Sequence, residues 1–190
     1  RRYVVDYVVV NAADYGVPQS RPRAIIKLYK NNYIWPLPET ENRITLREAI
    51  GYLPSLESGE VSEIKYHYAL KHTPMHVEVM SHTAEGCSAM KNEVYYPKKK
   101  NGQKVSGFHN TYNRMKWDEP CAAVTTNSGA ISGHNNVHPG RLKSDGTYSD
   151  ARALSLLELL IVSSIPTDWN LPVGYKESMV RTLIGEAIPP

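Results

Sequence analysis

Three polar side chains, Gln19, Arg21 and Arg23, occupy every second position near the end of the segment 11–23. In an extended segment, side chains at i and i+2 lie on the same face, so the three would point the same way. Two guanidinium groups placed in this way can bind a phosphate or the edge of a nucleic-acid base through paired hydrogen bonds. The alternative is a surface loop with two solvated arginines, and the spacing alone favours that alternative.

A second set of polar residues lies in the segment 112–127, which reads YNRMKWDEPCAAVTTN. An arginine can read guanine through two hydrogen bonds, and an asparagine can read adenine. The sequence does not indicate which side chains would contact bases and which would only hold the backbone. The candidates for DNA contacts are Arg114, Lys116, Thr125, Thr126 and Asn127.

Local charge favours a polyanionic partner more than the charge of the whole chain does. The net charge is only +3, whereas residues 97–117 hold six Lys or Arg and no Asp or Glu. A basic stretch of this kind can neutralise phosphates and attract a polyanion. A solvated lysine-rich loop would have the same composition, so charge alone leaves both interpretations open.

Four strings resemble motifs of the C5 cytosine-specific DNA methyltransferases, in the family's order. NAADYGVPQSRPR at 11–23 resembles the Gln-x-Arg-x-Arg motif, and 112–127 resembles part of the target recognition domain, with Ala123 where the family has a DNA-contacting Thr. His138-Pro139 followed by Arg152–Glu158 and Ile165–Trp169 resembles an element that organises this domain, with Ser155, Leu157 and Ile165 as departures. Gly185–Pro190 is similar to Gly-Asn-Ala-Val-Pro-Pro.

The resemblance implies a role for each candidate residue. Arg23 would contact a cytosine flipped out of the duplex and assist its activation, while Arg21 and Gln19 would hold the active-site wall and the DNA backbone. Glu186 and Ala187 would line the pocket for S-adenosylmethionine. The family has Asn where this chain has Glu186, and a carboxylate cannot donate a hydrogen bond as an amide does.

The residues that perform the family's reaction are missing from the sequence. The nucleophilic Cys after a sheet strand, the Glu of a Glu-Asn-Val motif and the Gly-rich cofactor turn do not occur. Cys121 follows a proline, but it falls within the recognition segment, and Cys87 lies in Gly-Cys-Ser. We therefore expect this chain alone to be inactive.

Two explanations fit the missing half. Either the chain is a piece of a longer protein, as its lack of an initiator Met suggests, or it is the smaller subunit of a split enzyme. In both cases the implied partners are double-stranded DNA and a catalytic half. The implied reaction is methyl transfer from S-adenosylmethionine to cytosine C5 in a short duplex site, in a bacterial restriction–modification setting. The alternative is a non-catalytic DNA-binding module or degenerate methyltransferase, suggested by Glu186 and the absent nucleophile.

Several elements must position these side chains. A β-branched run predicts a largely buried strand at Tyr3–Val10, followed by a second strand at Ala24–Tyr29. Residues 55–139 are polar and irregular, with short strands, of which Val124–Asn127 is one candidate. The expected helices are Thr45–Gly51 with Thr45 as N-cap, Arg152–Ser164 with Ser149 or Asp150 as cap, and Glu177–Ile184.

Together these elements predict an α/β fold, namely the edge of a doubly wound Rossmann-like sheet plus a small, irregular α+β recognition domain. The expected division is 1–54 for the last strands of the catalytic domain, 55–150 for target recognition, and 151–190 for the segment returning to the catalytic domain. The strands would be exposed where the rest of the sheet belongs, and exposed apolar edges associate. We therefore expect the chain to need a partner or to self-associate.

Composition limits the setting. No apolar run approaches the roughly 20 residues of a membrane span. The two cysteines lie far apart and without metal-ligand spacing, which is typical of reduced cysteines in a cytoplasmic protein, so no metal is expected.

Overall fold

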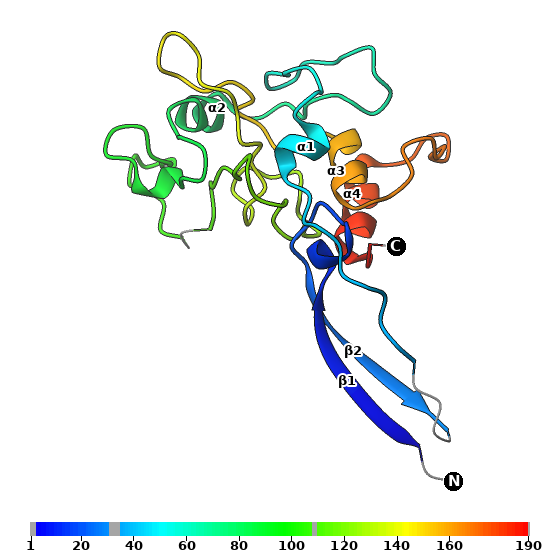
Figure 1. The fold of residues 1–190 in the computed structure, drawn as a ribbon. Coiled ribbons are helices and arrows are strands. Elements are labelled where there is room, and N and C mark those ends of the chain that lie inside the picture. Colours follow the sequence, from blue (N-terminus) through cyan, green and yellow to red (C-terminus); the bar gives the residue numbers. More distant parts are fainter. Residues whose placement is uncertain (1–2, 31–34, 108–109, 190) are drawn as a thin grey trace.

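A hairpin projects from a body that carries four helices in the part of the chain that the structure, a computed structural model, describes (Figure 1). That part comprises residues 3–30, 35–107 and 110–189. Arg1, Arg2 and Pro190, which belong to the first and last parts of the expected division, lie outside it. Pro190 is also the last residue of the expected cofactor turn.

The hairpin consists of β1 (Val4–Asn11) and β2 (Pro22–Tyr29), paired antiparallel from Val4 opposite Tyr29 to Asn11 opposite Pro22. The second strand is confirmed and begins two residues before its expected start. The expectation that the first strand is largely buried is wrong, since Val5, Tyr7 and Val9 are 62%, 75% and 68% exposed. The hairpin extends away from the body (Figure 1), and these apolar side chains are exposed in the described part of the chain.

The loop between the strands is held in a fixed shape. A 3-10 turn, η1 (Ala12–Tyr15), follows β1, and the Asn11 side chain caps it by accepting a hydrogen bond from the Ala13 N–H. Gly16 ends the turn at φ +78°, where a Cβ would lie 2.6 Å from a carboxylate oxygen of Glu41. Glycine therefore meets both demands of this position, a left-handed backbone and a close neighbour.

Two short helices begin with the same capping arrangement. α1 (Leu46–Ile50) has the expected N-cap, Thr45, which exchanges hydrogen bonds with Glu48. α3 (Leu156–Val162) is shorter than the expected Arg152–Ser164, because Ser155 is its cap and pairs with Glu158 in the same way. The expectation of Ser149 or Asp150 as cap is therefore wrong. α4 (Glu177–Glu186) confirms the last expected helix and ends two residues later.

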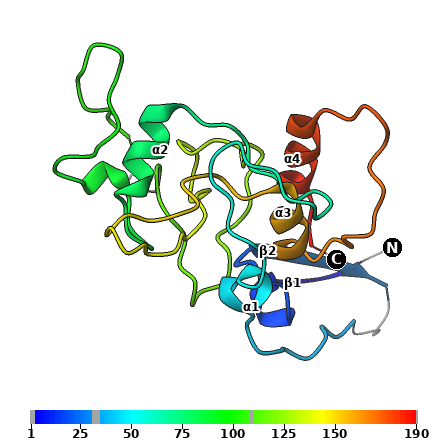
Figure 2. The same cartoon turned by 90° about the horizontal axis from the view of Figure 1, so that it is seen from above.

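The expected recognition region, 55–150, is irregular but not without helix. It contains α2 (Pro74–Ser81) and a 3-10 turn, η2 (Ala89–Lys91), neither of which was expected. Its β pairing consists of isolated bridges in the described residues, and Val124–Asn127 is not a strand. Figure 2 shows α2 and its loops on one side of the molecule and α3 and α4 on the other.

Two apolar clusters form the core. The first joins α1, α3, α4 and the segment 115–124, and its fully buried members include Leu46, Ile50 and Leu156. The second lies around α2 and includes Met80, Ile131 and Val137. The described residues contain one sheet, the two-stranded hairpin, so the expected doubly wound sheet is not complete within them. None of the helices they form is long and apolar enough to cross a membrane, and they contain no metal-binding cluster.

Candidate functional site

Gln19 is the first of the three alternating side chains, and it is buried, with 1% exposure. Its Nε2 donates to the Val162 carbonyl and the Ser163 hydroxyl, both at 3.2 Å. Its Oε1 accepts from the Val124 N–H at 3.2 Å. Gln19 therefore ties the loop to the end of α3 and to the recognition segment, and its side chain is closed off from a DNA backbone.

Arg21 is also buried, and its guanidinium binds the recognition segment again and the end of α4. Nη1 donates to the Val124 carbonyl at 2.9 Å, and Nη2 donates to the Gly185 carbonyl at 2.8 Å. Its Nε has no partner among the described residues. Burial, together with the charge of Arg23, lowers the pKa of Arg21.

Asn11 is a member of this site that the sequence reasoning missed. Its Oδ1 accepts from the Arg21 N–H at 2.8 Å, and its Nδ2 donates to the Ser20 hydroxyl at 3.1 Å. Backbone hydrogen bonds from Ser20 N to Cys121 O and from Cys121 N to Pro18 O fix the same loop against the recognition segment. An Asn at the point where a strand enters a turn was the available signal.

Arg23 differs from its two neighbours because it is exposed. It lies opposite Val10 in the hairpin, and its Nη1 donates to the adjacent Pro22 carbonyl at 2.6 Å. Arg23 and Arg21 line the same cavity, of about 450 Å³, together with Ile188 and Pro189. Arg21 thus lies between its two neighbours: it shares this cavity with Arg23, and its Nη1 donates to the Gln19 Oε1 at 3.5 Å, while Gln19 itself does not line the cavity.

Arg114 corrects the sequence interpretation most clearly. The side chain is fully buried and donates to the carbonyls of Met80, His138, Ser149 and Asp150 at 2.8–3.2 Å. Burial lowers its pKa to about 10, against the opposing effect of the Asp150 charge. The Arg114 guanidinium is surrounded by the backbone carbonyls that it binds, so it is not available to a guanine or a phosphate.

Lys116, by contrast, is exposed, and its Nζ pairs with Glu119 at 2.5 Å. Its stem crosses Gly86, where a Cβ would lie 2.9 Å from the Lys116 Cγ. Lys116 borders a cavity of about 350 Å³ between the loop and the recognition segment, whose polar lining includes Ser20, Asn113 and Asn135. The sequence reasoning missed these three, although alternation already places Ser20 on the face opposite Gln19 and Arg21.

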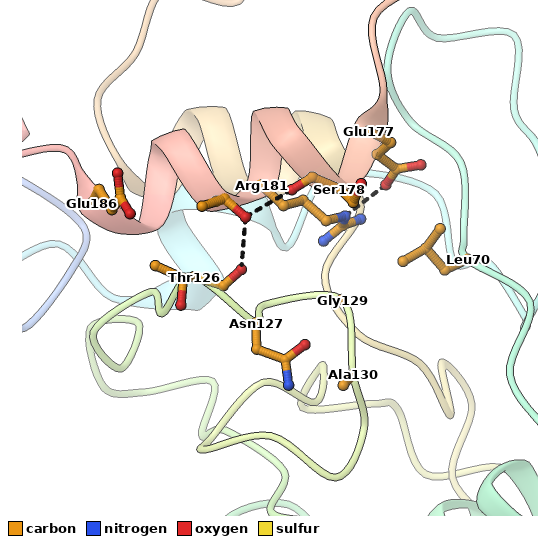
Figure 3. Close-up of a pocket in the computed structure, with 10 residues that line it drawn as sticks. Leu70, Thr126, Asn127, Gly129, Ala130, Glu177, Ser178, Arg181 and Glu186 are labelled. Atoms are coloured by element: carbon orange, nitrogen blue, oxygen red, sulfur yellow. Dashed lines mark hydrogen bonds and ion pairs between the residues drawn. The ribbon is translucent and has the colours of Figure 1, made fainter.

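A third cavity, of about 580 Å³, lies between α4 and the loop 126–130 (Figure 3). Thr126 and Asn127 are exposed along it, and Glu186 lies at its other end, so the structure brings expected DNA and cofactor residues to one hollow. Thr125 is only half-buried, and the Thr182 hydroxyl donates to the Thr126 carbonyl at 3.5 Å.

Arg181 is another member that the sequence reasoning missed. It is 3% exposed, and its Nε donates to Glu177 at 2.6 Å, an i, i+4 spacing that was a usable signal. Its Nη1 has no partner among the described residues. Figure 3 shows its guanidinium beside the hollow, near Ser178.

The expected cofactor residues are accessible but provide few hydrogen-bond donors. Glu186 is exposed at the last position of α4, and Ala187 follows it as C-cap. A carboxylate at this place accepts hydrogen bonds and carries negative charge. It fits the cationic amino group of S-adenosylmethionine and not its carboxylate. These two residues do not make a cofactor pocket by themselves.

Buried charges fix α3 relative to the recognition region. Arg152 donates to Asp150 at 2.8 Å and to both carboxylate oxygens of Glu158, at 2.7 and 2.9 Å. Burial raises the pKa of Glu158, but the Arg152 charge outweighs this effect and keeps it below its usual value. His138 lies between the two carboxylates, and burial, with the charge of Arg152, lowers its pKa to about 3.

Cys121 does not have the properties of a nucleophile. Burial raises the pKa of its thiol to about 12, whereas the reactive form of a cysteine is the thiolate. Its Sγ–H donates to the Ala122 carbonyl at 3.1 Å. Cys87 is exposed, and both cysteines are free.

Comparisons with known proteins address the whole chain. Residues 2–190 match the family described as C-5 cytosine-specific DNA methylase. The chain is 50% identical to the type II methyltransferase M1.HgaI of Avibacterium volantium, over 99% of this chain and 53% of that protein. It is 30% identical to the type II methyltransferase M1.HphI of Haemophilus parahaemolyticus, over 99% of this chain and 45% of that protein.

A solved structure, a putative DNA modification methyltransferase encoded within an E. coli prophage, has a similar fold. Its TM-score is 0.56 at 15% identity, and the match covers 98% of this chain and 56% of that one. The chain thus spans about half the length of the curated relatives it matches.

Proposed function

Because the chain belongs to the C-5 cytosine-specific DNA methylase family, we propose that it is the DNA-reading part of a complete methyltransferase. That enzyme transfers a methyl group from S-adenosylmethionine to C5 of a cytosine in a short duplex site. It acts in the cytoplasm of a bacterium, within a restriction–modification system. A second part, on the same longer chain or on a separate subunit, supplies the nucleophile and most of the cofactor pocket.

One observation carries this proposal: three separate segments converge on Gln19 and Arg21. Gln19 binds the end of α3, both residues bind Val124 of the recognition segment, and Arg21 binds Gly185 near the end of α4. Buried hydrogen bonds of this kind fix the relative positions of the segments they join. The loop therefore acts as a scaffold that sets where Arg23 stands relative to the recognition segment.

The proposed contacts follow from exposure. Arg23 is the residue that faces the flipped cytosine, because it is exposed beside a cavity that Arg21 also lines. Lys116, Thr126 and Asn127 contact the duplex, with Thr125 half-buried behind them. Gln19 and Arg21 are positioning residues, and Arg114 supports the recognition region from inside.

The hairpin indicates where the catalytic half attaches. The cross-strand pairs Val5–Leu28, Tyr7–Ile26 and Val9–Ala24 form one continuous apolar face. Five of these six side chains are large hydrophobic groups that are 62–75% exposed. A face of this kind on an unpaired two-stranded sheet is normally covered by a partner. We assign it to the catalytic half, and with it the division into 1–54, 55–150 and 151–190.

Complementation tests the proposal. The chain is mixed with the part of M1.HgaI that it does not match, and methyl transfer from labelled S-adenosylmethionine to mixed-sequence duplex DNA is measured. We expect neither part alone to methylate DNA and the mixture to do so. Methylation by this chain alone would contradict the proposal, and so would an inactive mixture in which the two parts bind each other.

Glu186 favours a second candidate function, a DNA-binding module that has lost its methyltransferase activity. An acidic side chain at this position disfavours the carboxylate of the cofactor. The two candidates differ in one property: the module binds duplex DNA equally well with and without S-adenosylmethionine and stays inactive in every mixture. The Glu186→Asn variant separates them further, because it raises the cofactor affinity of the reconstituted enzyme and changes nothing in a DNA-binding module.

A further inference from the structure

A basic β-ribbon, residues 97–105, projects from the recognition region. Lys98 and Lys104 form an antiparallel bridge, Lys99 N–H donates to the Gln103 carbonyl at 2.8 Å, and Val105 N–H donates to the Pro97 carbonyl at 2.9 Å. Gly102 turns the chain at φ +82°, and a Cβ there would meet no atom within 4 Å. The ribbon lies at the edge of the molecule beyond α2, far from α3 and α4 (Figures 1 and 2).

Two like charges lie next to each other on this ribbon. Lys98 and Lys104 lie opposite each other, and both ammonium groups lie over the Tyr96 ring, at 5.1 and 4.7 Å from its centroid. Like charges directly across a β pair are destabilising. In the described part of the chain no ion pair joins them, or Lys99 and Lys100, to a carboxylate. The Tyr96 ring thus gathers two positive charges, which no ion pair among the described residues neutralises.

The base of the ribbon is attached to the proposed DNA face. η2, just before the ribbon, pairs with the segment that leads to Lys116: Ala89 N–H donates to the Tyr112 carbonyl at 2.9 Å. Ser88 bridges to Asn113, which lines the same cavity as Lys116. Asn92 secures the other side by donating to the Tyr95 carbonyl at 2.8 Å. The ribbon is therefore a fixed extension of that face.

We infer that the ribbon 97–105 is a second DNA-binding element, which holds the phosphate backbone of the duplex outside the site read by the recognition segment. This inference rests on the proposed function. Lysine ammonium groups bind phosphates as point charges, and a two-stranded ribbon is narrow enough to follow a DNA groove. Its contribution is independent of sequence and depends strongly on salt, because each neutralised phosphate releases counterions.

Salt-dependent binding tests the inference. The full chain and the double variant Lys98→Gln, Lys104→Gln are titrated with a mixed-sequence 30-base-pair duplex across a series of NaCl concentrations. Each lost phosphate contact lowers the slope of log affinity against log salt by roughly 0.9, so we expect a decrease of roughly 1.8. At about 0.1 M salt this corresponds to a loss of affinity of about ten-fold or more.

A matched control removes the same charge elsewhere. Lys65 and Lys176 are exposed, and Lys176 is the N-cap of α4, on the opposite side of the molecule from the ribbon. The variant Lys65→Gln, Lys176→Gln keeps the slope of the unmodified chain. Far-ultraviolet circular dichroism shows that both variants stay folded.

Each result has one meaning. If the unmodified chain binds duplex DNA and the ribbon variant binds with the same slope, or if both double variants lose affinity equally, the ribbon is a solvated loop and the inference is wrong. If the unmodified chain binds no duplex DNA even when its catalytic half is present, the proposed function itself fails.

Discussion

Arg21 and Arg23 are separated by one proline, yet the structure places Arg21 in the interior and Arg23 at the surface. Arg21 donates its hydrogen bonds to the carbonyls of Val124 and Gly185, inside the molecule. Arg23 is exposed, and its guanidinium donates to the carbonyl of its neighbour, Pro22. The same residue type therefore serves as a scaffold at one position and is our proposed substrate contact at the other.

Substitution to alanine separates these two roles. Arg21→Ala leaves two buried carbonyls without a partner, so we expect the free energy of unfolding to fall by about 3 kcal/mol in urea denaturation. Arg23→Ala changes that free energy by no more than about 0.5 kcal/mol. It lowers methylation by the reconstituted enzyme about ten-fold or more, through the loss of a charged hydrogen bond. Equal destabilisation by both variants would contradict the assignment.

His138 makes stability depend on pH. Its pKa is lowered to about 3 in the folded chain, so the unfolded chain binds the proton more readily. Stability is therefore complete above the unfolded pKa of about 6.5 and decreases as pH falls below it. The decrease is about 1.4 kcal/mol per pH unit, or about 2 kcal/mol between pH 6.5 and 5.

Denaturation at pH 7 and pH 5 measures this dependence. We expect His138→Asn to reduce the difference between the two pH values, whereas His82→Asn, at an exposed histidine stacked on Tyr95, leaves it unchanged. An unaltered difference in His138→Asn would show that the buried histidine is not its source.

At the scale of elements, the same capping signal was recognised once and missed once. Thr45 comes after the prolines that break the chain, and Glu48 follows it at the spacing of a capping box. The sequence therefore predicts the start of α1. Ser155 and Glu158 have the same spacing, but apolar residues continue on both sides of Ser155, and that periodicity extends the expected helix back to Arg152. Before the cap, Ala153 forms an antiparallel bridge with Val137, and the His138 N–H donates to the Arg152 carbonyl at 2.9 Å, so these residues are bonded outside the helix.

Gly185, in α4, lies in close contact with the recognition segment. A Cβ on Gly185 would lie 2.4 Å from the Thr125 backbone carbon, which cannot move without shifting the recognition segment. We expect Gly185→Ala to lower the free energy of unfolding by about 1–3 kcal/mol, as overpacking does. Met179→Ala, at an exposed position of the same helix, should change it by less than about 0.5 kcal/mol, and a similar loss in both would rule out the close approach as the cause.

At the scale of the whole molecule, the sequence predicts the secondary structure of a segment better than it predicts what packs around that segment. The two hairpin strands and the helices α1 and α4 follow from local patterns, whereas α2 was not expected. The burial of Arg114 depends on four carbonyls that come from other parts of the chain. The exposure of β1 also has a non-local cause, because a β-branched run predicts burial whether or not the covering element belongs to the same chain.

The apolar hairpin face predicts association. In light scattering we expect the isolated chain to self-associate, and addition of the catalytic half to replace that association with a complex of one copy of each. Tyr7→Lys with Ile26→Glu abolishes both, since it places charges in the centre of the face. Val173→Lys, at a fully exposed apolar residue elsewhere, changes neither. A monomeric chain that also ignores the catalytic half would contradict this account.

The central claim is that this chain selects the DNA sequence, and a pair of hybrid enzymes tests it most directly. The unmatched halves of M1.HgaI and of M1.HphI are each combined with this chain, and the positions of 5-methylcytosine are mapped in genomic DNA. The account predicts that both hybrids methylate the same short sequence. Different sites, each following the donor of the catalytic half, would contradict it.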